Sequence, residues 1–384
     1  MAEEKKLRLS DKLSRFFPDW SLARELTIEQ VMRHQSGIHN FANDRSGTYQ
    51  EADPQTREEV RAILSKSRPD FKPGTRTAYN NANYIVLSLV AEALDSTDFS
   101  AIAWALSEQD TGSNPLLLAA IGLVAAGLAF KVSAVPFHAW APDAYQGASA
   151  PVAAFLAAGS KAAGLAVLGR VCLVAFGSEA DVLSVFLAGL AALSIVVGSF
   201  IALSQTDMKR LLAYSSITHV GYALLGLMAG TPEGVSATMT YAFFYVFMTI
   251  GTFGVISALG ERGEHLDGYQ GLASQRPGTA VLMLIFLLSL TGIPPTAGFV
   301  AKFVVIMSAV RAGHVVLAVL AVACSVVTAF IYMRVAVLMY MKEPQEKAPS
   351  RFPVAVSAAL AVAALVTVVG GISPGILAPW AVSP

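Results

Sequence analysis

From about residue 114 to the C-terminus, apolar runs of about 20 residues follow one another, and each is long enough to cross a bilayer as a helix. Lipid offers backbone groups no hydrogen-bond partner, so these runs predict helices rather than open sheet. We count about eight spans and expect a mainly α, polytopic membrane helix bundle. The predicted spans cover residues 116–145, 150–176, 182–203, 211–229, 235–259, 277–309, 315–341 and 353–377.

The beginning of the chain has a different composition. Charges of both signs are frequent up to about residue 76, although only 14% of the whole chain is charged and the mean hydropathy is +0.56. We therefore expect a small α-rich soluble fragment over 1–94, a junction over 95–114 and a membrane domain over 115–384. The formal net charge of zero argues against nucleic acid as a partner.

Two of the predicted spans are interrupted by proline and also carry lysine. The first contains Lys131 and Pro136, and Lys161 lies inside the next span; the other contains Pro294–Pro295 and Lys302. Charges within a bilayer are expensive and mark ion or proton pathways, while broken helices are tolerated where they line a polar interior. Broken helices in corresponding positions are typical of transporters. The pattern predicts an ion path.

A simpler interpretation exists for each of these residues taken alone. A lysine near the end of a span, such as Lys131 or Lys302, can extend its ammonium to the interface. A single histidine such as His219 is a helix-packing residue as often as a functional one. The two cysteines, Cys172 and Cys324, lie in apolar runs and are interpreted as packing residues.

Three motifs of the membrane part carry a resemblance that covers about 270 residues. They read FKVSAVPFHAWAPDAYQGASAPVAAFLAAGSKAAG, ALSQTDMKRLLAYSSITHVGY and LTGIPPTAGFVAKF. This part resembles the C-terminal two-thirds of subunit N of NADH-quinone oxidoreductase (complex I), a proton-conducting antiporter-like family. The resemblance implies that Lys131, Lys161 and Lys302 form a proton path, with His219 between them. The full family also has earlier spans, including a membrane glutamate that pairs with the first lysine.

The first 94 residues carry a second resemblance, in LSDKLSRFFPDW, LTIEQVMRHQSGI and FKPGTRTAYNNANYIVLSLVAEAL. They resemble the middle of a serine β-lactamase-like, or penicillin-binding, hydrolase, and Tyr79 and Asn81 match its Y-x-N motif. No serine before residue 94 has a lysine three positions later, so the Ser-x-x-Lys nucleophile motif is missing. We therefore interpret Tyr79 and Asn81 as a degenerate motif without catalytic activity. Thr27 and Gln30 predict a capping box.

The first resemblance implies a multi-pass subunit of the bacterial inner membrane, with the lipid bilayer and other complex I membrane subunits as partners. It would move protons while quinone is reduced elsewhere, and it would not be catalytic alone. We expect no metal or cofactor on this chain, because it has no Gly-rich dinucleotide loop and its two distant cysteines cannot hold an iron–sulfur cluster. Two alternatives stay open: a chimeric or truncated product without full activity, and a membrane-anchored serine hydrolase.

Overall fold

A computed structural model describes residues 9–40, 57–78, 80, 82–83, 85–87, 115–177, 180–344 and 352–377. The chain divides into two compact units, Met1–Ala105 and Leu106–Pro384. The expected boundaries at residues 94 and 114 lie outside the described residues, so the three-part division stays a prediction. Tyr79 and Asn81 also lie outside them.

The N-terminal unit contains short helices around a small apolar core. Two 3₁₀ turns, Leu13–Arg15 and Ser21–Arg24, precede α1 (Ile28–Met32) and α2 (Arg57–Lys66). The predicted capping box at the start of α1 is confirmed, because Thr27 and Gln30 each bond the other's backbone N–H with a side-chain oxygen. The core includes fully buried Leu13, Leu26, Val31 and Leu64.

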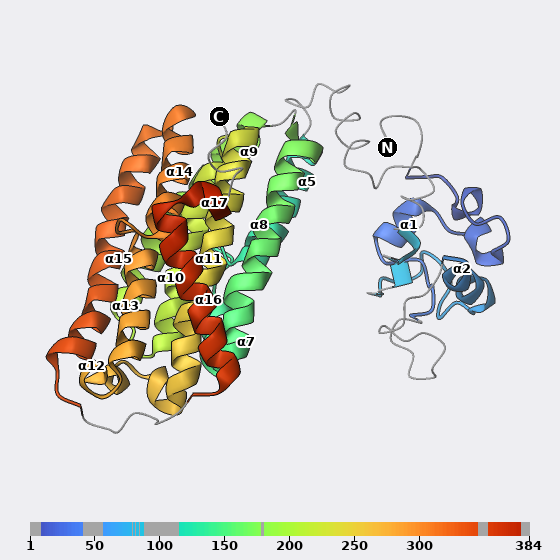
Figure 1. Cartoon of the computed structure of the whole chain (residues 1–384). Helices are drawn as coiled ribbons and strands as arrows, with labels where there is room; N and C mark the ends of the chain where they lie inside the picture. The colour runs from blue at the N-terminus through green and yellow to red at the C-terminus, as the bar shows by residue number, and fades with distance from the viewer. Residues whose placement is uncertain are drawn as a thin grey trace. The chain divides into compact units, whose positions relative to one another are not determined.

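The second unit is a bundle of helices, and its described residues form no named strand. Figure 1 shows α5 and α8 on one side of the bundle and α15 on the other. The long helices are α5 (Pro115–Val132), α8 (Lys161–Arg170) with the preceding α7 (Ala150–Phe155), α9 (Ala180–Leu203), α10 (Met208–Leu227), α11 (Pro232–Leu259), α13 (Pro277–Thr291), α14 (Ala297–Arg311), α15 (Val315–Met341) and α16 (Val354–Ile372). Shorter helices are α6 (Trp140–Gly147), α12 (Leu272–Gln275) and α17 (Pro374–Leu377).

Each predicted span corresponds to one helix or to a pair of consecutive helices, which confirms the expected fold class. Five segments of the described chain are long and apolar enough to cross a membrane: Ala150–Arg170, Val182–Leu203, Pro232–Glu264, Val315–Met341 and Val354–Ile372. Two further apolar helices, α5 and α13, each end where the chain breaks.

Helices α10 and α11 form the centre of the bundle. Nearly every side chain of α10 is buried, and α11 contacts α7, α8, α10, α13, α14 and α16. Since protein surrounds α10 on all sides, it can carry serine, threonine, histidine and tyrosine at membrane depth, where their polar groups find partners inside the bundle. The polar site of the molecule therefore lies on this helix.

Both predicted interruptions are present. After α5 the chain turns through residues 133–139 before α6 begins, and Val135–Pro136 is a cis peptide. After α13 the chain turns through Gly292, which has a left-handed φ of 87°, and a cis Pro294–Pro295 peptide before α14 begins. Glycine takes this conformation without the steric conflict of a β-carbon, so it ends α13 cleanly.

Candidate functional site

Lys161 is the first lysine of the interior. It begins α8 directly after a π-helical turn, Leu156–Ser160, and its side chain is 1% exposed. The ammonium donates a 2.7 Å hydrogen bond to the Ser216 hydroxyl of α10 and lies 5.8 Å from the centroid of the Tyr145 ring. π-Helical turns inside α-helices are frequent at functional sites, and here the turn is followed at once by Lys161.

His219 lies about one turn after Ser216 on α10 and is also buried. Its Nδ1 is 2.6 Å from the Tyr241 hydroxyl of α11, and its Nε2 is 3.4 Å from the Tyr332 hydroxyl of α15. Tyr332 in turn hydrogen-bonds Ser215, the neighbour of Ser216. Both ring nitrogens of His219 therefore face hydroxyl groups that can donate or accept a proton.

Lys302 of α14 is the second interior lysine, and it is 6% exposed. Its ammonium donates a 2.8 Å hydrogen bond to the carbonyl of Thr291, the last residue of α13. It also lies 4.5 Å from the centroid of the Tyr222 ring, and the Tyr222 hydroxyl is 2.8 Å from Ser325. The carbonyls of the last helical turn have no partner within the helix, so a cation there is doubly favoured.

These contacts bring together three of the predicted site residues. We call the group the central polar cluster and define it as Lys161, Ser215, Ser216, His219, Tyr222, Tyr241, Tyr245, Tyr332 and Lys302. It joins α8, α10, α11, α14 and α15 through the middle of the bundle. His219 thus contacts hydroxyl groups on both ring nitrogens, and the Lys302 ammonium bonds a backbone carbonyl inside the bundle.

Lys131 lies elsewhere. It is in the last turn of α5, its side chain is exposed, and its ammonium forms no hydrogen bond with another described residue. Pro136, Pro294 and Pro295 lie in the two turns that interrupt the broken helices, as predicted. The structure thus places Lys161, His219 and Lys302 in one cluster and leaves Lys131 outside it.

Sequence reasoning missed the four tyrosines of the cluster. Tyr241 and Tyr245 lie in the span predicted over residues 235–259, and neither was among the predicted site residues. The signal that could have revealed the site is on α10, where Ser215, His219 and Tyr222 recur at helical spacing on one face. A polar stripe on a buried helix needs polar partners on its neighbours, and tyrosine is the residue that supplies them here.

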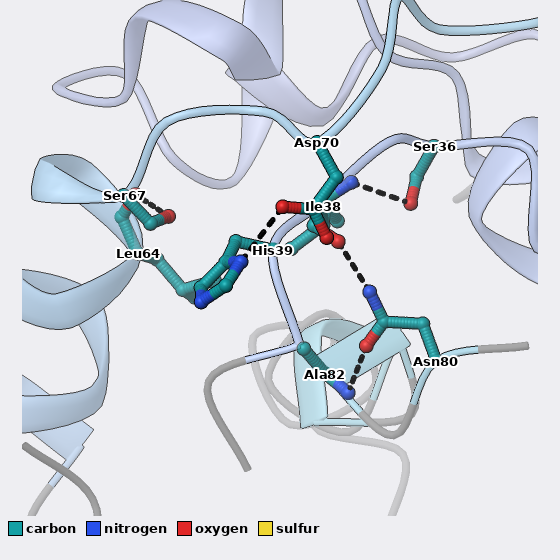
Figure 2. A network of polar contacts seen from close by, with 8 residues as sticks. All are labelled: Ser36, Ile38, His39, Leu64, Ser67, Asp70, Asn80 and Ala82. Atoms are coloured by element: carbon teal, nitrogen blue, oxygen red, sulfur yellow. Dashed lines mark hydrogen bonds and ion pairs between the residues drawn. The ribbon is translucent and has the colours of Figure 1, made fainter. Parts of the chain in front are cut away.

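The N-terminal unit has its own polar network, drawn in Figure 2. The Asn80 side chain donates to the carbonyl of Ile38 and accepts from the N–H of Ala82. Ser36, at the end of the LTIEQVMRHQSGI stretch, accepts a hydrogen bond from the Ile38 N–H and donates to the Asn83 side chain at 2.6 Å. These contacts hold two segments together around the turn.

Together, a bundle of apolar helices, two broken helices and a buried lysine–histidine cluster are typical of a polytopic membrane protein. The family model described as NADH:quinone oxidoreductase/Mrp antiporter, TM, matches residues 84–328. The chain belongs to this family. A second model, described as β-lactamase, matches residues 1–105, in agreement with the second resemblance.

Curated relatives agree with the family model. NADH-quinone oxidoreductase subunit N of Desulfovibrio desulfuricans is 46% identical over 296 residues, which cover 73% of this chain and 59% of the relative. The subunit N of Desulforamulus reducens is 45% identical, covering 70% of this chain and 57% of the relative. The chain thus spans less than two-thirds of the length of these relatives.

Solved structures show the same fold. A chain of respiratory complex I from Thermus thermophilus with bound aureothin matches with a TM-score of 0.62 and 36% identity, over 77% of this chain and 68% of that chain. A chain of the membrane-bound sulfane sulfur reductase, an archaeal respiratory membrane complex, matches with a TM-score of 0.62 and 28% identity. That match covers 79% of this chain and 66% of the other. The similar chains are parts of multi-subunit membrane complexes.

Proposed function

We propose that the membrane unit acts as a subunit N-like component of an NADH-quinone oxidoreductase. It moves protons across the bacterial inner membrane while quinone is reduced elsewhere in the complex. The observation that carries the proposal is the central polar cluster, in which two buried lysines lie on either side of His219. The family membership and the subunit N relatives support the same activity.

The chemistry of the cluster suits proton transfer. Lysine and histidine take up and release protons, and serine and tyrosine hydroxyls can relay one because each both donates and accepts. From Lys161 a proton would pass through the Ser216 hydroxyl. His219 would exchange a proton with Tyr332 or Tyr241. A cavity of about 10 Å³ beside Ser215 and Tyr245 has room for about one water.

Electrostatics would couple the two lysines. Like charges repel strongly in a low-dielectric interior, so a change of charge at Lys302 changes the electrostatic potential at the other groups of the cluster. A change of charge at one end of the cluster therefore shifts the proton occupancy of the next group. This gives a physical means by which events in a neighbouring subunit would drive proton movement through this one.

The test replaces Lys161 by methionine, which keeps the length of the side chain and removes the proton-binding group. The full chain is expressed in a bacterium that lacks its own subunit N, and proton uptake by inverted membrane vesicles is measured during NADH oxidation. We expect Lys161→Met to lower proton uptake tenfold or more. Since Lys342 is exposed at the end of α15, Lys342→Met is the matched control and should leave proton uptake unchanged.

Two measurements separate the possible outcomes. NADH oxidation with an artificial electron acceptor reports on the electron-transferring subunits and should be equal in all strains. Retention of the chain with the other membrane subunits during purification reports on assembly, which the proposal requires. Unchanged proton uptake in Lys161→Met contradicts the proposal, whereas an assembled parent chain without proton uptake favours the truncated, inactive alternative.

For the N-terminal unit, the β-lactamase match favours a hydrolase origin. We propose that it has no hydrolase activity, because residues 1–94 contain no Ser-x-x-Lys nucleophile motif. The full chain in detergent should hydrolyse a chromogenic cephalosporin no faster than buffer. Hydrolysis that Ser36→Ala abolishes would overturn this view.

A further inference from the structure

Tyr145 is a buried tyrosine at the edge of the central polar cluster. It lies on α6, the short helix after the first break, and its side chain is fully buried. The Lys161 ammonium is 5.8 Å from the centroid of its ring, and the ring packs edge-on against Phe253 of α11 at a centroid distance of 6.3 Å. These contacts explain an aromatic ring at this position, but they do not explain its hydroxyl group.

The Tyr145 hydroxyl makes no hydrogen bond of regular geometry with a described residue. Tyr222, which is also fully buried, differs in this respect, because its hydroxyl is 2.8 Å from the Ser325 hydroxyl. A buried hydroxyl without a regular partner lowers the stability of the folded state, and phenylalanine would fill the same space without that cost. The hydroxyl of Tyr145 therefore calls for a functional explanation.

Ser216 is the neighbour through which the Tyr145 hydroxyl can act. The Ser216 hydroxyl accepts a 2.7 Å hydrogen bond from the Lys161 ammonium and donates a 2.7 Å hydrogen bond to the Ala213 carbonyl. These two bonds use its proton and one of its two lone pairs, so the second lone pair can accept another proton. Tyr145 lies close enough to both Ser216 and Tyr245 to interact with each. It is thus next to a proton acceptor on one side and a proton donor on the other.

We propose that Tyr145 is a further relay residue of the proton path, between Ser216 and Tyr245. When a proton moves toward Lys161, the Ser216 hydroxyl turns from the Ala213 carbonyl and gives its proton to the neutral amine, while its oxygen takes the proton of Tyr145. Tyr145 then receives a replacement proton from Tyr245. Each hydroxyl gives one proton and takes one, so no charge stays on it, and the reverse order moves a proton away from Lys161. This inference rests on the proposed function of the membrane unit.

The relay connects the Lys161 side of the cluster with the His219 side. Among the described residues, no hydrogen bond joins Ser216 directly to His219, although the two are about one turn apart on α10. The rings of His219 and Tyr245 lie 5.0 Å apart, centroid to centroid. A proton that passes between Tyr145 and Tyr245 therefore reaches the immediate surroundings of His219.

The position of α6 is fixed by contacts that do not involve the Tyr145 hydroxyl. Arg210 of α10 donates a 2.6 Å hydrogen bond to the Asp143 carboxylate in the first turn of α6. Lys209 donates a 3.0 Å hydrogen bond to the carbonyl of Ala148, the residue that follows α6. Because both ends of α6 are held from α10, removal of the hydroxyl should leave the ring of Tyr145 in place.

The test is Tyr145→Phe, which removes the hydroxyl and keeps the ring. Proton uptake by inverted membrane vesicles during NADH oxidation should fall about fivefold, because one relay group is lost. The thermal unfolding midpoint in detergent should rise by about 2 °C, because a buried hydroxyl without a regular partner is removed. A purely structural hydroxyl would give the opposite pair of results, a lower midpoint and unchanged proton uptake.

Tyr269→Phe is the matched control. Tyr269 is also fully buried, but its hydroxyl donates a 2.9 Å hydrogen bond to the Gly263 carbonyl, away from the central polar cluster. This variant loses a regular hydrogen bond and no relay group. Its unfolding midpoint should therefore fall, and its proton uptake should equal that of the parent chain.

A double variant tests whether Tyr145 acts through Ser216. Groups on one route are not independent, so the losses of Ser216→Ala and Tyr145→Phe should not multiply. The double variant should take up protons at the rate of Ser216→Ala alone. A loss equal to the product of the two single losses would place Tyr145 on a separate route and contradict the proposal.

The outcome for Lys161→Met separates this proposal from the proposed function on which it rests. If Lys161→Met loses proton uptake and Tyr145→Phe does not, the relay is wrong and the proposed function stands. If neither variant loses proton uptake, both are wrong. A lower unfolding midpoint of Tyr145→Phe, or its loss from the assembled complex during purification, would also overturn the relay, because the hydroxyl would then have a structural role.

Discussion

The two broken helices of the membrane unit look alike in sequence, yet they hold their lysines in different ways. In the second, Lys302 lies beyond the break and reaches back to the Thr291 carbonyl at the end of α13. In the first, Lys131 lies before the break, and the Phe130 carbonyl at the end of α5 is bonded instead by the indole N–H of Trp140 at 3.0 Å. A neutral indole N–H thus bonds the helix-end carbonyl at the first break, and a cation bonds it at the second.

The backbone N–H groups of the two breaks are satisfied by the same residue type from different places. The Val135 N–H bonds the Ser194 hydroxyl of α9 at 2.9 Å, and the Gly298 N–H bonds the Ser289 hydroxyl of α13 at 3.0 Å. The first break therefore depends on a neighbouring helix, whereas the second is closed by its own two halves. A broken helix in lipid must satisfy its freed backbone groups, and the choice of partner decides whether a charge becomes buried there.

The largest effect is expected at the close contact that closes the second break. A β-carbon on Gly298 would lie 1.7 Å from the Ser289 carbonyl oxygen, which is backbone and cannot rotate away. Gly298→Ala should lower the free energy of unfolding by about 3 kcal/mol, as in severe overpacking. The thermal unfolding midpoint in detergent measures this. Gly278→Ala in the same pair of helices meets open space and should unfold like the parent; an equally stable Gly298→Ala would mean that the two halves are not in contact.

The next effect concerns the two lysines themselves. Lys302→Met removes a member of the central polar cluster, so proton uptake by membrane vesicles should fall tenfold or more, a barrier change of about 1.4 kcal/mol. Lys131→Met removes an exposed side chain outside the cluster, and proton uptake should fall threefold or less. Equal losses in the two variants would show that Lys131 and Lys302 contribute equally to proton uptake. The two breaks would then differ in structure but not in function.

Much of this arrangement could be predicted from the sequence. Apolar runs gave the helices, prolines gave both breaks, and the lysines gave a candidate path, because each of these signals is local. Helix ends were less accurate: α10 begins at Met208 rather than Leu211, since the Asp207 carboxylate accepts a hydrogen bond from the Arg210 N–H and starts the helix earlier. Capping by a side chain is a local signal that the apolar pattern alone does not include.

The part of the site that could not be predicted from the sequence depends on which helices are neighbours. Whether Lys131 is buried is decided by the side chains packed around α5, which its own sequence does not specify. Tyr241 and Tyr332 likewise join the cluster only because α11 and α15 turn those faces toward α10. Apolar helices that are hydrophobic all round have no periodicity to show which face is inside, so tertiary contacts alone decide it.

A smaller effect tests the dependence of the first break on α9. Ser194 is fully buried, and Ser194→Ala leaves the Val135 N–H without its acceptor. An unpaired buried donor costs about 1–2 kcal/mol, so the unfolding midpoint should fall measurably. Ser204→Ala is the control, because Ser204 is at the exposed end of the same helix. Its hydroxyl donates to the Ile201 carbonyl in the last turn of that helix, and not to another helix. If Ser194→Ala unfolds like Ser204→Ala, the first break is not anchored on α9.

The smallest effect is expected where α8 passes the end of α5. A β-carbon on Gly164 would lie 2.7 Å from the Val132 side chain, and its nearest neighbours are side-chain atoms rather than backbone. Because the close contact is with one γ-methyl group rather than with backbone, Gly164→Ala should lower the free energy of unfolding by about 1 kcal/mol, partly offset by the better helix propensity of alanine. The double variant Gly164→Ala, Val132→Ala should recover the part that comes from the clash. A loss as large as that of Gly298→Ala would mean that the first break is as rigid as the second, and the contrast between a break closed by its own halves and one held by its neighbours would no longer hold.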